Sequence, residues 1–128
     1  MRLLALETAT LAGGAALLDD GRLIGESRLN IALTHSERLM AVVDRLLQDC
    51  AWEASTLRAL AVSIGPGSFT GLRVGAATAK GLALALDLPI APVPTLDALA
   101  ATLPFADAPV LKLYERFERG VYKTLKTA

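Results

Sequence analysis

The feature that most constrains the fold of this chain is the pattern that runs across residues 60–86. Residues 60–64 form an apolar run typical of a buried strand, and a glycine-rich loop follows at residues 65–71. From about residue 70 to residue 86 the apolar residues continue at helical spacing, with Arg73 and Lys80 as the only charges. A buried strand that leads into a long helix predicts a βα unit, and such units form parallel sheets with helices on their faces.

The residues before this unit predict three strands joined by short turns. Asp20-Gly21 between two apolar runs is a strong signal for a tight hairpin. Thr34 and Glu37 have capping-box spacing at the start of an amphipathic helix. A meander that continues into βαβ units gives a mixed five-stranded sheet with helices on its faces and right-handed crossovers. We therefore predict strands at residues 3–8, 12–18, 22–29, 60–64 and 90–93, and helices at residues 34–50, 70–86 and 95–103.

The last 22 residues differ in composition from the rest of the chain. Residues 1–106 contain seven Arg and a single Lys, whereas residues 107–128 contain three Lys and two Arg. Residues 110–113 and 121–125 are candidates for two further strands. This shift predicts a boundary near residue 106, beyond which the chain is either frayed or the start of a further unit.

Composition restricts the function classes that are open to the chain. Its 128 residues carry 13 basic and 13 acidic side chains, so the chain has no net positive charge that would favour direct binding of nucleic acid. The single cysteine, Cys50, excludes an internal disulfide and is typical of a small buried hydrophobic residue in a reducing compartment. The apolar run at residues 74–86 is too short to span a bilayer. These features predict a soluble, cytoplasmic protein without a membrane partner.

The glycine loop matches no phosphate-binding or nucleophile motif in full. No lysine follows the glycines as a Walker loop requires, and Gly71 stands one position late for the dinucleotide fingerprint. Ser68 lacks the flanking glycines of a nucleophile elbow, and the sole histidine, His35, lies at the start of another element. Anion binding by the loop amides and a Ser68–His35 pair remain as alternatives.

A structural turn is the interpretation that we favour for this loop. Pro66 fixes its own φ, and the flanking glycines can adopt positive φ for a sharp reversal of the chain. Ser68 or Thr70 is then placed to cap the long helix that follows. The residues of this predicted structural loop are Gly65, Pro66, Gly67 and Gly71.

Three segments together closely resemble the bacterial TsaB family, also called YeaZ. They are residues 65–75 (GPGSFTGLRVG), residues 4–10 (LALETAT) and residues 34–39 (THSERL). The resemblance extends from residue 1 to about residue 103 and is weaker between residues 110 and 122. It implies an α/β protein of the ASKHA (actin/Hsp70-like, ribonuclease H-like) fold, which has two related lobes. Residues 1–106 would then be the first lobe, and residues 107–128 a remnant or start of a second lobe that is largely missing.

The resemblance also implies a function in tRNA modification. TsaB proteins act with TsaD, TsaE and TsaC to make the threonylcarbamoyl group on adenosine 37 of certain tRNAs, and TsaB is regarded as the non-catalytic partner of TsaD. TsaD relatives carry a His-x-x-x-His pair that suits a metal, and the matching positions here are Thr95 and Leu99. Neither residue supplies an imidazole or a carboxylate, so we expect no metal site and no catalytic residue.

Nucleotide binding is also not expected from the residues present. Residues 7–10 with Gly13 and Gly14 occupy the place of the first phosphate loop of the family's fold. They offer backbone amides but no cationic group, and Glu7 is better interpreted as an acid paired with a local partner. We therefore expect no cofactor.

The apolar helices at residues 36–50 and 70–86 are the predicted interface, because large apolar surfaces usually mark association sites. The resemblance implies a TsaD-type catalytic subunit and a TsaE-type ATPase as partners, a homodimer through these helices, and only indirect contact with tRNA. Two alternatives stay open: an ASKHA-type ATP-binding enzyme or peptidase, and a truncated dimerising lobe without activity of its own. The candidate interface residues are Leu39, Met40, Val43, Leu72, Gly75 and Ala79.

Overall fold

The computed structural model describes residues 1–10, 13–28 and 36–101. Several predictions concern residues outside these ranges. They are the capping box that includes Thr34, the placement of His35, the end of the last helix at residue 103, the two further strands and the division at residue 106.

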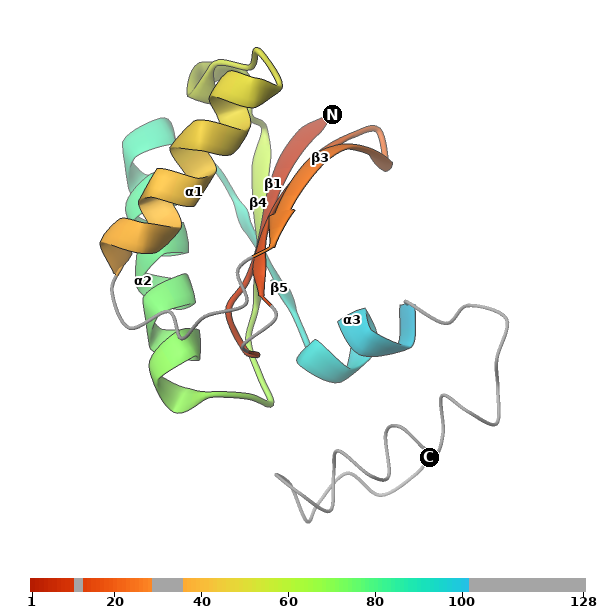
Figure 1. Ribbon diagram of the computed structural model, residues 1–128, viewed down its shortest axis with the longest axis vertical. Helices are drawn as coiled ribbons and strands as arrows, with labels where there is room; N and C mark the ends of the chain where they lie inside the picture. The colour runs from red at the N-terminus through yellow and green to blue at the C-terminus, as the bar shows by residue number, and fades with distance from the viewer. Residues whose placement is uncertain (11–12, 29–35, 102–128) are drawn as a thin grey trace.

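A mixed five-stranded sheet forms the centre of the molecule (Figure 1). Its strands run in the order β3-β2-β1-β4-β5, with β1 antiparallel to β2 and parallel to β4. The β2–β3 pair is antiparallel and the β4–β5 pair is parallel, so the predicted meander followed by βαβ units is confirmed. The strands are β1 (Arg2–Glu7), β2 (Gly14–Asp19), β3 (Arg22–Arg28), β4 (Ala59–Ser63) and β5 (Ile90–Val93).

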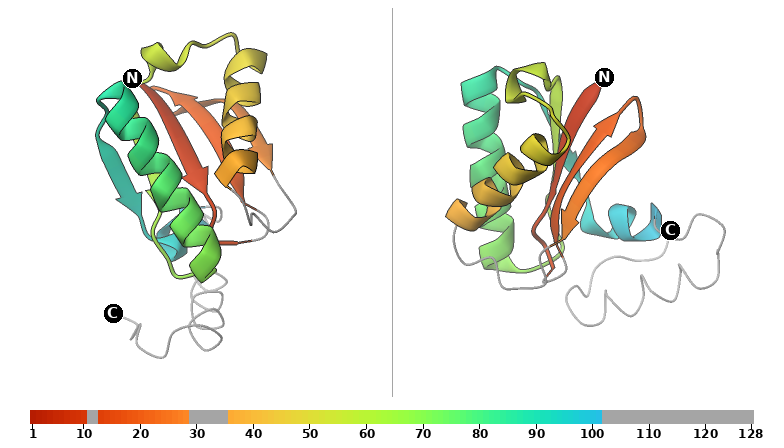
Figure 2. Two further views of the ribbon diagram at one scale, coloured as in Figure 1. Left: turned by 90° about the vertical axis from the view of Figure 1, so that its left-hand side faces the viewer. Right: turned by 45° about the horizontal axis from the view of Figure 1, so that its top comes forward.

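The helices cover the two faces of this sheet unequally. Helices α1 (Ser36–Asp49) and α2 (Phe69–Leu86) pack side by side on one face, as both views in Figure 2 show. The short helix α3 (Thr95–Ala101) lies on the opposite side, directly after β5. A single 3-10 turn, η1 (Ala54–Thr56), connects α1 to β4 within the described residues. Much of the second face of the sheet is therefore free of helices in the part of the chain that the structure describes.

The hydrophobic core lies between the sheet and the pair of helices α1 and α2. Leu4 and Leu17 face this side from β1 and β2, and Leu60 does so from β4. Each of these side chains is fully buried, as is Leu39 of α1. Because side chains alternate across a strand, the neighbours of these leucines face the other side of the sheet. That second face carries small and polar residues and forms the candidate site described below.

The hairpin between β2 and β3 confirms the turn predicted from Asp20-Gly21. Asp19 pairs with Arg22, so the loop consists of two residues. Asp20 has φ of 50° and Gly21 has φ of 79°, and positive φ at both positions is the signature of a type I′ turn.

Two glycines allow α2 to approach the end of β1 closely. A Cβ atom on Gly71 would lie 2.0 Å from the backbone oxygen of Thr8, and one on Gly75 would lie 2.1 Å from its Oγ1. No side chain fits at these distances, so only glycine permits this contact. The Gly71-x-x-x-Gly75 spacing puts both glycines on one face of the helix. The pair therefore fixes how deeply α2 sits against the sheet.

Candidate functional site

The glycine loop connects β4 to α2 and has the geometry of a sharp turn. Gly65 has φ of 110° and is followed by a cis peptide bond to Pro66. A Cβ on Gly67 would lie 2.5 Å from the carbonyl oxygen of Ala9, and the same oxygen accepts a 2.8 Å hydrogen bond from the Ser68 amide. The loop is thus held against the end of β1.

Ser68 is the N-cap of α2, which confirms one of the two predicted candidates, Ser68 and Thr70. Its Oγ accepts a hydrogen bond of 3.1 Å from the amide of Gly71. A side chain used in this way satisfies one of the free amides at the start of the helix. The observed contacts of Ser68 are therefore those of the structural turn, and His35 lies outside the described residues.

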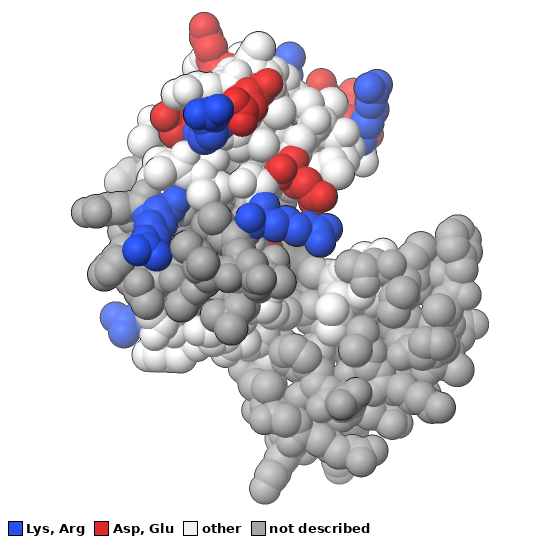
Figure 3. All heavy atoms as spheres, viewed as in Figure 1, with Lys and Arg blue, Asp and Glu red and all other residues white. Residues whose placement is uncertain are grey.

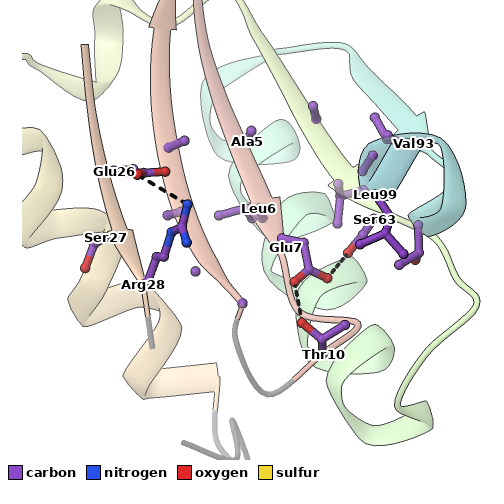
Figure 4. Close-up of a pocket in the computed structure, with 18 residues that line it drawn as sticks. Ala5, Leu6, Glu7, Thr10, Glu26, Ser27, Arg28, Ser63, Val93 and Leu99 are labelled. Carbon is purple, nitrogen blue, oxygen red and sulfur yellow. Dashed lines mark hydrogen bonds and ion pairs between the residues drawn. The ribbon is translucent and has the colours of Figure 1, made fainter. Parts of the chain in front are cut away.

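A pocket of about 450 Å³ occupies the second face of the sheet (Figure 4). It lies toward the carboxyl ends of the parallel strands β1, β4 and β5, where Glu7, Ser63 and Val93 end their strands. Ligand sites in sheets with parallel strands are commonly found at this edge. The remaining lining residues are Ala5, Leu6, Thr10, Gly13, Gly14, Ala15, Ala16, Glu26, Ser27, Arg28, Ala61, Val62, Thr95, Ala98 and Leu99.

Glu7 is the centre of a local hydrogen-bond network in this pocket. Its Oε1 accepts a 2.6 Å hydrogen bond from the Ala9 amide and a 3.3 Å bond from the Ser63 hydroxyl. Its Oε2 accepts a 3.0 Å bond from the Thr10 hydroxyl. Figure 4 shows the carboxylate between Ser63 and Thr10. The prediction that Glu7 pairs with a local group is confirmed, although its partners are neutral donors.

Ser63 links this network to the buried backbone. Its Oγ accepts a 3.2 Å hydrogen bond from the Thr8 amide while it donates to Glu7, and the side chain is buried. The hydroxyl thus orients the carboxylate from the neighbouring strand. Residues 60–64 were predicted only as a buried strand, because the sequence does not show the register that brings Ser63 beside Glu7.

Thr95 and Leu99, which the resemblance was expected to match to the TsaD histidine pair, both line this pocket. Thr95 is 5% exposed, and its Oγ1 has no hydrogen-bond partner within the described part of the chain. Its amide donates a 2.8 Å bond to the carbonyl oxygen of Gly65, which ties α3 to the glycine loop. No group of three or more His, Cys, Asp or Glu side chains that could hold a metal ion occurs within residues 1–10, 13–28 and 36–101.

The charged residues of the pocket lie mainly at its outer edge. Arg28 and Glu26 of β3 form an ion pair at 3.6 Å, and both side chains are exposed, at 76% and 45%. Exposed pairs of this kind are weak. Basic and acidic residues are also interspersed over the described part of the face drawn in Figure 3, which shows no continuous basic surface there.

Most of the predicted interface residues lie inside this lobe. Leu39, Val43 and Ala79 are core residues with exposures of 0%, 2% and 0%, and Gly75 is buried against Thr8. Four of the six therefore have almost no surface for a partner. The other two candidates are more accessible: Met40 is 40% exposed, and Leu72 is half-buried.

The outer face of α2 holds apolar surface that the sequence analysis did not single out. Phe69 is 74% exposed and Leu84 is 87% exposed. Five of the exposed residues of the helix recur at spacings of four, four, three and four, which places them on one face. They are Phe69, Arg73, Ala77, Lys80 and Leu84. Because α2 is apolar nearly all round, its sequence could not indicate which stripe faces outward.

None of the helices in the described ranges is long and apolar enough to cross a membrane. This observation agrees with the length of the apolar run at residues 74–86. Cys50, the free cysteine, is half-buried and packs against the edge of the core, as expected for a small hydrophobic residue.

Comparisons with known proteins agree with one another about this architecture. The family model for TsaD, tRNA N6-adenosine threonylcarbamoyltransferase, matches residues 30–114. The TsaB protein of Bacillus subtilis, named a tRNA threonylcarbamoyladenosine biosynthesis protein, is 37% identical over 98% of this chain and 55% of its own length. That of Haemophilus influenzae is 42% identical over 78% of this chain and 42% of its own length.

A solved structure shows the same fold. YeaZ from Pseudomonas aeruginosa superposes with a TM-score of 0.67 at 39% sequence identity, over 73% of this chain and 43% of that one. The mixed sheet with its helices, the TsaD family match and this superposition together define an ASKHA-like α/β lobe. The chain belongs to the TsaB (YeaZ) family. It spans about half the length of the curated relatives it matches.

Proposed function

We propose that this chain is a non-catalytic partner subunit that supports threonylcarbamoylation of adenosine 37 in tRNA by pairing with a TsaD-type catalytic subunit. The main support is its 37% identity to a protein named for this pathway, along 98% of the chain. A TsaE-type ATPase is a further partner in this proposal. The chain's equal numbers of acidic and basic residues favour only indirect contact with tRNA.

The outer faces of α1 and α2 are the proposed pairing surface. Leu84 and Phe69 on α2 and Met40 on α1 expose apolar side chains on the two helices that pack together. Arg73 lies over the Phe69 ring with 5.3 Å between its guanidinium carbon and the ring centre, which places a cation beside the apolar surface. Interfaces combine an apolar centre with Arg and aromatic residues in this way. The same surface is the proposed site of a homodimer.

The non-catalytic role rests on the chemistry of the pocket. Ser63 donates to Glu7 and accepts from the Thr8 amide, and Glu7 accepts from the Ala9 amide. Their arrangement is that of a structural network. A nucleophile would need a base within hydrogen-bond reach, and Ser63 donates only to a carboxylate that has two other donors. Thr95 is a neutral hydroxyl at a position where the resemblance to TsaD implies a histidine.

An affinity experiment with a TsaD-type subunit tests the proposal. The purified full chain is titrated into the catalytic subunit in a calorimeter, and saturable heat with a defined stoichiometry is expected. Failure of the two proteins to associate at micromolar concentration would contradict the partner role. A truncated lobe that only dimerises would self-associate in sedimentation without binding the TsaD-type subunit, which separates that alternative.

A second titration tests the enzyme alternative. Here ATP with Mg²⁺ is added to the isolated chain, and the expected result is the heat of dilution alone. Saturable ATP binding, followed by release of phosphate that depends on Glu7, would favour an ATP-binding enzyme. Glu7→Gln is the variant for this comparison, because Gln retains a carbonyl oxygen for the Ala9 amide.

A further inference from the structure

The register of the strands places a floor of small side chains across the second face of the sheet. Ala5 pairs with Ala16 on one side and with Ala61 on the other, and Ala61 pairs with Ala91. Alanines in paired positions of adjacent strands share one face of the sheet. The first three of these residues line the pocket of about 450 Å³. Their methyl groups make a low apolar floor over three adjacent strands.

The next row toward the carboxyl edge is polar. Glu7 lies in register with Gly14, and Gly14 with Arg28, while Ser63 lies in register with Val93. Gly14 has no side chain, and a Cβ there would lie 1.9 Å from the backbone oxygen of Ser27, so backbone rather than a side chain separates Glu7 from the edge residue Arg28. The pocket thus has an apolar floor and a carboxylate at one end, as Figure 4 shows for Ala5 and Glu7.

Two groups in this pocket lack the partners that their chemistry favours. Thr95 Oγ1 has no hydrogen-bond partner among the residues that the structure describes, although the residue is only 5% exposed, and buried hydroxyls are normally paired. Among the described residues, no Lys or Arg nitrogen lies within 4.0 Å of the Glu7 carboxylate, and its donors are all neutral. A carboxylate binds a cationic donor more strongly than a neutral one.

We propose that this pocket binds a small organic ligand with a primary ammonium group and a short apolar body. The ammonium donates to Glu7 Oε2, which within the described ranges accepts one hydrogen bond, from the Thr10 hydroxyl. The apolar body covers the alanine floor, and a polar substituent pairs with the Thr95 hydroxyl. The proposal is independent of the pairing surface on α1 and α2, which lies on the other face of the sheet.

A series of three matched probes tests this inference. Phenethylamine, 2-phenylethanol and 3-phenylpropionate share an apolar body and differ in the charge of the end group. Each is titrated into the full chain labelled with ¹⁵N, and amide chemical shifts are followed. We expect shifts at Glu7, Thr10, Gly13 and Gly14, and at Ser63 and Thr95, with the amine. The affinity for the amine should be at least about tenfold higher than that for the alcohol. The carboxylate is expected to bind weakest.

Two variants assign the selectivity to residues. Glu7→Gln should abolish the preference for the amine over the alcohol, because the charge is lost while a carbonyl oxygen remains. Thr95→Val removes the hydroxyl that pairs with the ligand's polar substituent, so this variant is tested with 2-amino-1-phenylethanol, which carries a hydroxyl. The substitution should weaken binding of this probe and leave binding of phenethylamine unchanged. Gln48→Ala, on the exposed face of α1, is the control and should change neither affinity.

The outcomes separate clearly. Equal affinity for the amine and the carboxylate, a preference for the amine that survives Glu7→Gln, or no shift with any probe would each overturn the proposal. The dispersion of the amide spectrum shows whether each variant is folded, and Thr95→Val still tests the pocket if Glu7→Gln is not. Loss of probe binding leaves association with a TsaD-type subunit unchanged, so the two proposals fail independently.

Discussion

At the scale of single residues, hydroxyl groups determine how the loops are fixed. Ser68 caps α2, and Ser63 connects the Glu7 carboxylate to the Thr8 amide. The capping role could be predicted from sequence because a hydroxyl stands directly before a helical pattern, although Thr70 was an equal candidate. The contact between Ser63 and Glu7 could not, since it joins residues 56 positions apart and depends on the register of two strands.

The first prediction concerns the cap of α2. Ser68→Ala should lower the free energy of unfolding by about 1 kcal/mol, because the Gly71 amide loses its acceptor. Thr70→Ala is the matched control, since Thr70 is exposed and is not the N-cap residue. Its expected change is within about 0.5 kcal/mol. Urea denaturation of both variants measures the difference, and an equal loss in both would show that Ser68 is not the cap.

At the scale of elements, the contact between α2 and β1 depends on the absence of side chains. The length of α2 was predictable from its run of apolar residues, and its observed bounds differ from the prediction by one residue at the start. The two positions that touch Thr8 were not predictable, because several glycines and alanines share the helix. Only the structure shows that Gly71 and Gly75 face the sheet while Gly81 has open space beside it.

The second prediction compares two glycines of the same helix. Gly75→Ala places a methyl group 2.1 Å from Thr8 Oγ1 and should destabilise the fold by about 1–3 kcal/mol through overpacking. Gly81→Ala meets nothing within 4 Å and should stabilise by about 0.5–1 kcal/mol, because alanine favours the helix. Thermal and urea unfolding report both changes. A Gly75→Ala variant as stable as Gly81→Ala would contradict the close packing of α2 on β1.

At the scale of the whole molecule, the sequence pattern was sufficient to predict the sheet and the helices α1, α2 and α3. It was not sufficient to predict the pocket or the outward face of α2. Short apolar runs and the Asp20-Gly21 turn predicted the meander, and the glycine loop marked the βα unit. The floor of the pocket arises from in-register alanines on three strands, which no local pattern reveals. The outward stripe of α2 was hard to predict because Arg73 and Lys80 are its only charges and apolar residues surround them. Consequently Gly75 and Ala79 of α2 were predicted at an interface, and both are buried.

The central claim, that α1 and α2 pair with a TsaD-type subunit, is tested most directly by charge substitutions on the outer stripe of α2. Leu84→Glu and Phe69→Glu change side chains that are 87% and 74% exposed, so the lobe should stay folded. Leu23→Glu is the control, because Leu23 is 51% exposed on β3, at the edge of the sheet away from β5.

The measurement is the dissociation constant of each variant for the TsaD-type subunit, determined by calorimetry on proteins whose folding is verified by circular dichroism. We expect Leu84→Glu and Phe69→Glu to weaken binding by at least about tenfold, because a buried apolar contact is replaced by a charge. Leu23→Glu should bind as the unmodified chain does. Unchanged affinity in both α2 variants, or an equal loss in Leu23→Glu, would contradict the proposed pairing surface.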